Sequence, residues 1–279
     1  MINFAPFKET ITMNKELLQT AIQAAIAAGL EIMKIYTHPE SDWEIEYKAD
    51  NSPLTLADRM AHQTIMQYLE KTPYPVLSEE GAHAPYETRR DWHTLWVVDP
   101  LDGTKEFVKR NGEFTVNIAL VENNTPILGV IYVPARKIIY YGSLEKGAYK
   151  GAVNTEDMRV MHTLRMPLNH LEESQPYTVV ASRSHMSAET EAYIENLRKE
   201  KGEVNMVQGG SSLKICFVAE GIAQQYPRLG PTMEWDTAAG HAIVKAAGGE
   251  MYHAETGEPV VYNKEDLHSP WFIVKGFDA

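Results

Sequence analysis

The sequence is short of cysteine, of positive charge and of long apolar segments. Its 279 residues include one cysteine, Cys216, so a disulfide framework is excluded and a reducing compartment is expected. Cys216 lies in the apolar stretch 215–219, where a buried small side chain is far more common than a nucleophile. No run of about 18 apolar residues is present, so we expect no transmembrane helix. The first residues also lack the basic and apolar regions of a secretory signal.

Acidic residues outnumber lysine and arginine by 38 to 26, which gives a net charge of −12. This balance argues against a broad basic surface for a nucleic acid polymer. An acidic protein that handles phosphate esters needs local positive charge, and bound divalent cations can supply it. With 44% hydrophobic residues, the chain can build one large domain or two closely packed halves.

The spacing of apolar residues predicts helices and strands in two successive parts. Helices are predicted from Asn14 to about Thr37, before Pro39, and from Thr55 to Lys71. Segments rich in Val, Ile and Tyr predict an antiparallel meander packed on these helices, with strands at 94–98, 114–121, 126–133 and 137–142. In the second part of the chain, strand-like and helix-like segments alternate. This alternation predicts strands at 177–182, 203–207, 222–226, 249–252 and 271–274, and helices at 187–200, 211–220 and 237–247.

These elements predict an α/β (α+β) fold built in layers. We expect residues 14–160 to form the helix pair and the antiparallel sheet, with most of the candidate metal ligands. Residues 161–279 are expected to form a smaller α/β half that packs closely on the first, with the boundary in the polar stretch 151–175.

The segment WVVDPLDGTKEF, residues 96–107, is the most informative part of the chain. An apolar strand ends at Asp99, and a second carboxylate, Asp102, follows three residues later across a turn. Mg²⁺ prefers oxygen ligands and often takes one or two carboxylates together with phosphate oxygens. Each aspartate could face a different cation, with the Leu101 carbonyl between them. Gly103 and Thr104 then allow the backbone to approach an anion. The alternative for an isolated motif is a β-turn in which both aspartates bond nearby backbone groups.

Three further acids lie at predicted element boundaries. Asp58 follows Thr55 at the spacing of a helix capping box, and it could instead lie at the edge of a site and bind a metal-held water. Of the adjacent pair Glu79 and Glu80, we expect Glu79 to serve a cation and Glu80 to orient a water. Asp236 precedes an alanine-rich helix, where capping and metal ligation are compatible. Each acid alone has a structural explanation, but together they favour a shared cation site.

The blocks around Glu79, Asp99 and Asp236 follow one another along the chain in this order. Together they resemble the lithium-sensitive, magnesium-dependent phosphatase superfamily that includes inositol monophosphatase and fructose-1,6-bisphosphatase. The resemblance covers about residues 14 to 275. The segment 101–107 resembles the 3′(2′),5′-bisphosphate nucleotidase branch, because Lys105-Glu106 stands where inositol monophosphatases typically have Thr-Asn. Further blocks similar to that branch lie at 182–185, 210–214, 219–221, 226–228 and 230–232.

The resemblance implies alternating helix and sheet layers and two or three Mg²⁺ ions. It implies metal ligation by Glu79, Asp99, the Leu101 carbonyl, Asp102 and Asp236, and catalytic roles for Asp58, Glu79 and Thr104. Asp58 and Thr104 match the positions that orient the attacking water. Substrate contacts are expected from Glu79, Leu101, Asp102, Gly103, Thr104, Ser211, Lys214 and Asp236.

The second phosphate of such a substrate needs separate recognition. Ser211, with Ser212, lies at a predicted helix start and Lys214 follows within one turn, an arrangement that could hold this phosphate. The alternative is an ordinary helix N-cap with a surface lysine. Arg183 and Arg228 are weaker candidates, and His185 is expected to contact substrate or to be structural rather than to act as a general acid.

Together these expectations describe Mg²⁺-dependent removal of the 3′-phosphate from adenosine 3′,5′-bisphosphate, giving AMP and phosphate in support of sulfur assimilation. An inositol-phosphate or sugar-phosphate phosphatase is the alternative within the same class. A non-catalytic metal- and nucleotide-binding regulator is the alternative from another class. We expect a cytoplasmic monomer or weak homodimer, with peripheral attachment to the cytoplasmic face of the inner membrane left open.

Overall fold

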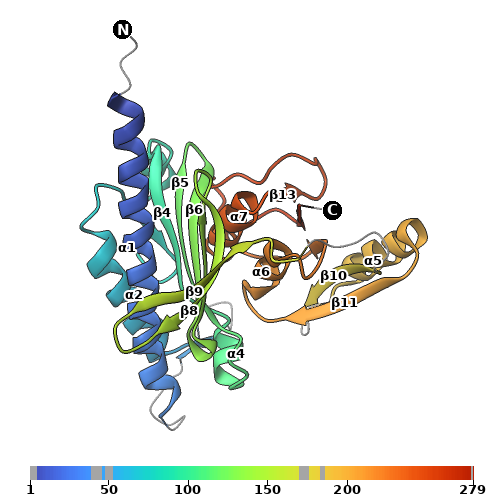
Figure 1. The fold of residues 1–279 in the computed structure, drawn as a ribbon, viewed down its shortest axis with the longest axis horizontal. Coiled ribbons are helices and arrows are strands. Elements are labelled where there is room, and N and C mark those ends of the chain that lie inside the picture. Colours follow the sequence, from blue (N-terminus) through green and yellow to red (C-terminus); the bar gives the residue numbers. More distant parts are fainter. Residues whose placement is uncertain (1–4, 39–45, 48–52, 170–175, 183–185, 278) are drawn as a thin grey trace.

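Helices and sheets alternate in layers across the molecule (Figure 1). The computed structural model describes residues 5–38, 46–47, 53–169, 176–182, 186–277 and 279. From one side to the other, the layers are α1 with α2, a seven-stranded sheet, α7 with α6, a five-stranded sheet, and α5. The layered α/β fold expected from the sequence is confirmed. No helix among the described residues combines the length and apolar character needed to cross a membrane.

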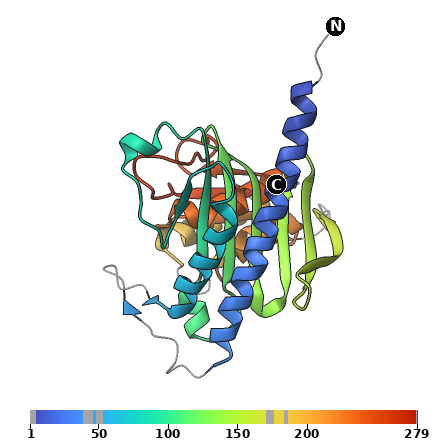
Figure 2. The same ribbon diagram turned by 90° about the vertical axis from the view of Figure 1, so that its left-hand side faces the viewer.

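Helices α1 (Ala5–Tyr36) and α2 (Leu56–Leu69) lie side by side on the outer face of the seven-stranded sheet (Figure 2). Buried alanines on both helices allow this close approach, because a methyl group keeps the helix axes near each other. Helix α1 begins nine residues before the expected start at Asn14. The early start is compatible with Pro6, since proline is tolerated in the first turn of a helix. Helix α1 ends at Tyr36, which confirms the predicted end near Thr37.

The seven-stranded sheet has the order β3-β4-β5-β6-β7-β8-β9, parallel between β3 and β4 and antiparallel elsewhere. The predicted meander is confirmed, but two further strands, β8 and β9, extend it. Strand β9 lacks an apolar pattern because it is an exposed edge strand, whereas β8 pairs on both sides and its sequence, GAYKGAVN, has few large apolar residues. The strands are β3 (Val76–Ser78), β4 (Thr94–Asp102), β5 (Thr115–Glu122), β6 (Thr125–Val133), β7 (Ile138–Ser143), β8 (Gly147–Asn154) and β9 (Arg159–Met166).

Strand β5 shows why the centre of this sheet reads as a continuous apolar run. Its residues alternate between the two faces, so Val116 and Ile118 pack toward α1 and α2. Ala119 and Val121 belong to the core on the opposite face, which α7 covers. Both faces are therefore buried, and Asn117, which points to the α7 side, is a polar residue inside the core.

The five-stranded sheet has the order β11-β10-β12-β14-β13 and lies between α6 and α5. Its strands are β10 (Tyr177–Ser182), β11 (Val204–Gly209), β12 (Gln225–Arg228), β13 (Glu250–His253) and β14 (Phe272–Lys275). The helices are α5 (Ala188–Lys201), α6 (Leu213–Glu220) and α7 (Glu234–Ala246). Strand β12 starts three residues later than predicted, because Gly221 ends α6 in the left-handed conformation and a short connection follows. Cys216 of α6 is buried, as predicted.

Short elements complete the chain, and the division into two halves stays a prediction. Strand β9 runs across residue 160, where that division was placed, and pairs with β8 in the seven-stranded sheet. The short elements are β1 (Glu46–Tyr47), β2 (Pro53–Leu54), α3 (Tyr86–Arg89), α4 (Thr104–Val108) and a 3₁₀ turn (Pro134–Arg136).

A polar network anchors the C-terminal end of α7. Glu250 of β13 accepts a hydrogen bond from the buried ring of His241 (2.5 Å) and another from Lys245 (2.5 Å). Burial alone would raise the pKa of Glu250, but these two donors outweigh it and lower the pKa to about 2. Burial also lowers the pKa of His241, so the neutral ring donates from Nε2 and accepts from the Tyr262 hydroxyl at Nδ1 (3.0 Å).

This network predicts part of the acid sensitivity of the fold. A carboxylate whose pKa is depressed in the folded state stabilises the fold above its unfolded pKa, near 4.3. That contribution is lost as the pH falls from about 4 through about 2. Solvent reaches part of Glu250, so we expect Glu250→Gln to lower the free energy of unfolding at pH 7 by about 1–2 kcal/mol. Denaturant titrations should show this difference shrinking toward pH 3; a constant difference would contradict the assignment.

Candidate active site

Acidic side chains from three separate segments line one cavity of about 690 Å³. Glu79 follows β3, Asp99 and Asp102 lie at the end of β4, and Asp236 lies in the first turn of α7. Leu101 lines the same cavity. The structure thus brings together all five residues predicted as metal ligands.

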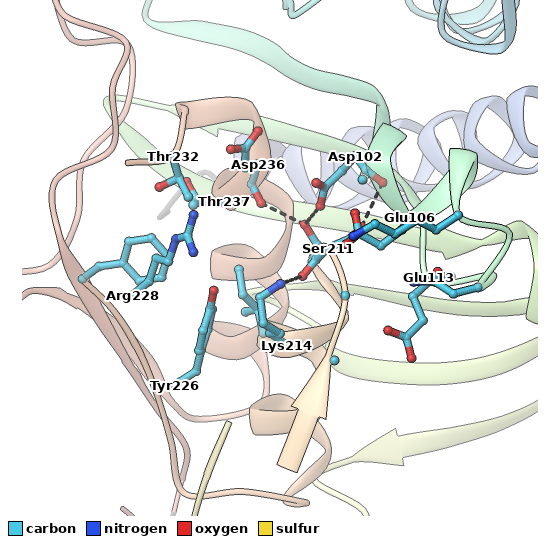
Figure 3. Close-up of a pocket in the computed structure, with 18 residues that line it drawn as sticks. Asp102, Glu106, Glu113, Ser211, Lys214, Tyr226, Arg228, Thr232, Asp236 and Thr237 are labelled. Atoms are coloured by element: carbon cyan, nitrogen blue, oxygen red, sulfur yellow. Dashed lines mark hydrogen bonds between the residues drawn. The ribbon is translucent and has the colours of Figure 1, made fainter. Parts of the chain in front are cut away.

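A second cavity, of about 360 Å³, shares part of its wall with the first, and Figure 3 shows residues that line this second cavity. Asp102, Glu106 and Asp236 line both cavities. Lys214 lines only the second, and Arg228 lines both. The first cavity, called the acidic chamber below, has Glu79, Asp99 and Lys105 in the rest of its wall, and the second has Glu113, Lys109 and Lys214.

The end of β4 is irregular, and this irregularity exposes its carboxylates to the cavity. Asp99 pairs with Asn117 of β5, and Asp102 pairs with Thr115, so four residues of β4 span three of β5. The Leu101 N–H donates to Asp99 Oδ1 (3.1 Å). The turn alternative raised from the sequence is thus present in part, and the same aspartate also faces the other acids.

Gly103 allows the chain to turn sharply after Asp102. Its φ is +85°, in the left-handed region, and a Cβ added there would lie 1.9 Å from Ser211 Oγ. Ser211 Oγ donates to the Asp102 carbonyl (3.0 Å), so the two segments touch at this glycine. Only glycine fits both the backbone conformation and the contact.

We therefore expect Gly103→Ala to be more damaging than backbone strain alone. Gly257 is the matched control, because its φ is +73° but no atom lies within 4 Å of an added Cβ. Gly257→Ala should lower the free energy of unfolding by about 1–2 kcal/mol, the cost of the left-handed conformation. Gly103→Ala should lower the free energy of unfolding by more than this amount, as measured by denaturant unfolding. It should also reduce activity, as measured by phosphate release. Equal losses for the two variants would contradict the close contact with Ser211.

Asp58 combines the two roles considered from the sequence. Its Oδ2 accepts from the Thr55 N–H (2.7 Å) and hydroxyl (2.6 Å), which completes a capping box at the start of α2. Its Oδ1 accepts from the Thr104 hydroxyl (3.1 Å) at the start of α4. Burial raises the pKa of Asp58 to about 6, although the Thr55 hydrogen bonds oppose this. Thr104 is thereby tied to a buried carboxylate.

Asp102 is held by residues that sequence reasoning did not assign to it. Ser212 Oγ donates to Asp102 Oδ2 (2.7 Å) and lies 2.9 Å from the Asp236 carbonyl oxygen. Asn117 Nδ2 donates to Ser212 Oγ (2.9 Å) from the middle of β5. The signal that could have revealed Asn117 is its polarity at a core-facing strand position. Ser212 precedes α6 without a side-chain cap, so its hydroxyl serves Asp102.

Asp236 is the third residue of α7, and the prediction that it is the N-cap is wrong. Its Oδ2 accepts from the N–H of Met233, the actual N-cap (2.9 Å). The helix consequently begins three residues earlier than predicted. Burial, followed by the charge of Asp102, raises the pKa of Asp236 to about 8.

Asp99 shows how concentrated the negative charge is. The side chain is 1% exposed, and burial followed by the carboxylates of Glu79, Asp102 and Asp236 raises its pKa well above the usual range. Within the part of the chain that the structure describes, no group of three or more His, Cys, Asp or Glu side chains is arranged to hold a metal ion by itself. An open, all-oxygen set of buried acids nevertheless suits Mg²⁺, which keeps waters and substrate oxygens as ligands. The residues present thus fit a divalent cation.

Lys214 supplies positive charge next to these acids. Its ammonium donates to the Ser211 carbonyl (2.7 Å) and lies 5.8 Å from the centre of the Tyr226 ring. Burial lowers the pKa of Lys214, and the nearby Asp102 opposes that shift. Lys214 therefore lies at the cavity wall rather than on an open surface. Arg183 and His185, also considered from the sequence, lie outside the described residues.

The fold and the acidic cavity define a phosphatase of the inositol monophosphatase family. The model of that family matches residues 13–271, and the chain belongs to it. This is a family of metal-dependent phosphatases.

Named relatives cover nearly the whole chain. The 3′(2′),5′-bisphosphate nucleotidase CysQ of Escherichia coli (strain K12) is 45% identical over 92% of this chain and 99% of its own length. The CysQ of Buchnera aphidicola is 41% identical over 95% of this chain and 94% of its own length. The crystal structure of CysQ from Bacteroides thetaiotaomicron is 54% identical, with a TM-score of 0.83 over 94% of this chain and 97% of that one.

Proposed function

We propose that this protein is a Mg²⁺-dependent 3′(2′),5′-bisphosphate nucleotidase. It hydrolyses adenosine 3′,5′-bisphosphate at the 3′ position and gives AMP and phosphate. The observation that carries this assignment is the pair of adjoining cavities that share Asp102 and Asp236, one of them also lined by Glu79 and Asp99 and the other by Lys109 and Lys214. A substrate with a phosphate at each end matches two such chambers, and the relatives named above carry the same activity in their names.

In this proposal the acidic chamber holds the phosphate that is cleaved. Glu79, Asp99, the Leu101 carbonyl, Asp102 and Asp236 hold two or three Mg²⁺ ions. When bound, these ions neutralise the phosphate and acidify a water molecule. The backbone of Gly103 and Thr104 binds the phosphate where the chain turns into α4.

Thr104 and Asp58 orient the attacking water. The Thr104 hydroxyl donates to Asp58 Oδ1, so its lone pairs can accept a hydrogen bond from the water molecule. Asp58 is mostly ionised at neutral pH, because its raised pKa is still about 6. It thereby keeps the Thr104 hydroxyl in the accepting orientation and can take up a proton. No covalent nucleophile is required for this route.

The second chamber binds the 5′-phosphate. Lys214 has N–H groups beyond the one that it donates to Ser211, and Arg228 lies in the same wall. Ser211 lines this chamber where α6 approaches Gly103. A phosphate at this wall gains charge-assisted hydrogen bonds without crossing the acidic chamber.

Phosphate release from three substrates tests this function. The enzyme is given adenosine 3′,5′-bisphosphate, inositol 1-phosphate or fructose 1,6-bisphosphate with Mg²⁺, with and without lithium. We expect preference for the nucleotide and inhibition by lithium. Preference for inositol or sugar phosphate would replace the assignment by that of a related phosphatase. Nucleotide binding without phosphate release would indicate a regulator. A cytoplasmic location and a monomeric or weakly dimeric state remain part of this proposal.

A further inference from the structure

A buried polar network lies beside the acidic chamber, and the mechanism above does not use it. Arg89 of α3 is 3% exposed, Asn263 is 4% exposed and Glu234 of α7 is fully buried. Long-range contacts connect these three residues, although Arg89 and Asn263 lie 174 positions apart. Burying a guanidinium and a carboxylate is costly unless both are well hydrogen-bonded, so this network has a structural purpose.

Arg89 binds two chain segments at once. Its Nε donates to the Ala84 carbonyl (3.0 Å), at the end of the segment that starts with Glu79. Its Nη1 donates to Asn263 Oδ1 (2.9 Å) and to the Lys264 carbonyl (3.1 Å), and its Nη2 donates to the Glu265 carbonyl (3.3 Å). The planar guanidinium thus fixes the loop after β3 against the loop before β14.

Asn263 lies between the buried cation and the buried anion. Its Nδ2 donates to the Arg89 carbonyl (2.7 Å), and its N–H donates to Glu234 Oε2 (2.6 Å). Glu234 also accepts from the Lys264 N–H (3.1 Å) and forms an ion pair with the Lys264 ammonium. The carboxylate at the start of α7 is therefore tied through Asn263 to Arg89.

The two ends of this network adjoin candidate metal ligands from different parts of the chain. Glu234 lies two residues before Asp236 in the first turn of α7. Trp235 between them contacts the ring of His83, with 5.2 Å between ring centres. His83 in turn bonds the Ser78 carbonyl (2.9 Å), next to Glu79. The loop that carries Glu79 is thus attached to the start of α7 at two points.

We propose that Arg89, Asn263 and Glu234 form a positioning brace that sets the placement of Glu79 relative to Asp236 and so tunes cation affinity. This proposal rests on the proposed function in one respect: it requires that a cation binds to these acids. None of its three residues touches substrate or metal. Their effect passes through the loop 79–85 and the first turn of α7. Partners behind metal ligands commonly change metal affinity about 10–100-fold.

The test compares Mg²⁺ binding in two brace variants with a matched control. Asn263→Gly removes the amide without backbone strain, since Asn263 has a φ of +61°. Arg89→Lys keeps the positive charge but removes the planar guanidinium group, whose N–H groups hydrogen-bond both loops. Glu250→Gln is the control, because it removes a charge-assisted network from the other end of α7. Calorimetric titration with Mg²⁺, without substrate, measures affinity, and thermal unfolding measures stability.

We expect both brace variants to bind Mg²⁺ about tenfold or more weakly. Near-normal kcat should return at saturating Mg²⁺, with KM for the nucleotide little changed. Glu250→Gln should lose stability and keep its Mg²⁺ affinity. Unchanged affinity in Asn263→Gly, or equal weakening in the Glu250→Gln control, would overturn the brace. If the Arg89→Lys variant does not fold, the Mg²⁺ affinity of the Asn263→Gly variant alone decides whether the brace exists. A wild-type protein that binds no Mg²⁺ would instead overturn the proposed function, and the brace with it.

Discussion

Replacing Asp102 with asparagine is expected to remove nearly all phosphate release while the protein stays folded. Asp102 lines the cavity proposed to hold the cleaved phosphate and the cations, and it also lines the neighbouring chamber, so its charge acts at the centre of the site. Asparagine keeps the size of the side chain, and its oxygen can still accept from Ser212. The negative charge is lost, and one acceptor oxygen is replaced by an NH2 group that can only donate. We expect the rate to fall on the order of 10²–10³-fold or more, the scale of removing one strong electrostatic contact.

The measurement is Mg²⁺-dependent phosphate release from adenosine 3′,5′-bisphosphate, together with thermal unfolding of the same sample. Asp157→Asn is the control, because it makes the same chemical change at an exposed ion pair with Arg159. The control should keep wild-type activity. Wild-type activity in Asp102→Asn would exclude Asp102 from the reaction. Loss of the cooperative unfolding transition in this variant would indicate a structural role for Asp102.

Removal of divalent cations by a chelator is expected to stop phosphate release and to lower the thermal unfolding temperature. Both should return when Mg²⁺ is added. The physical reason is the crowding of buried carboxylates: burial first, and then the charges of Glu79, Asp102 and Asp236, raise the pKa of Asp99. A cation that binds only the folded state stabilises it by mass action, about 2.7 kcal/mol at one hundred times its Kd.

Asp99→Asn separates cation binding from a general salt effect. Removing one repelling charge should stabilise the cation-free protein and flatten its response to Mg²⁺. The comparison uses scanning fluorimetry with Mg²⁺ against sodium chloride of equal ionic strength. Full activity after complete chelation would refute the cation requirement, and an unaltered Mg²⁺ response in Asp99→Asn would remove Asp99 from the ligand set.

Much of the fold could be predicted because regular elements are encoded by periodicity. The apolar run in 114–121 indicated β5, and the helical spacing after Asn14 indicated α1. Strand β9 escaped prediction, since an exposed edge strand lacks the apolar pattern of a buried one, and β8 escaped because its sequence has few large apolar residues. The early start of α7 escaped because Asp236 caps the helix from its third residue.

The sequence by itself determined the local chemistry: the turn at Asp99–Gly103, the capping box of Asp58 and the order of the acidic blocks. These features depend on neighbours within a few residues, whose backbone preferences are the same in any fold. Only the tertiary structure decided that Ser212 and Asn117 hold Asp102, or that Arg89 reaches Asn263. Such partners lie far apart along the chain and meet only because burial of apolar faces brings their elements together, which no local pattern encodes.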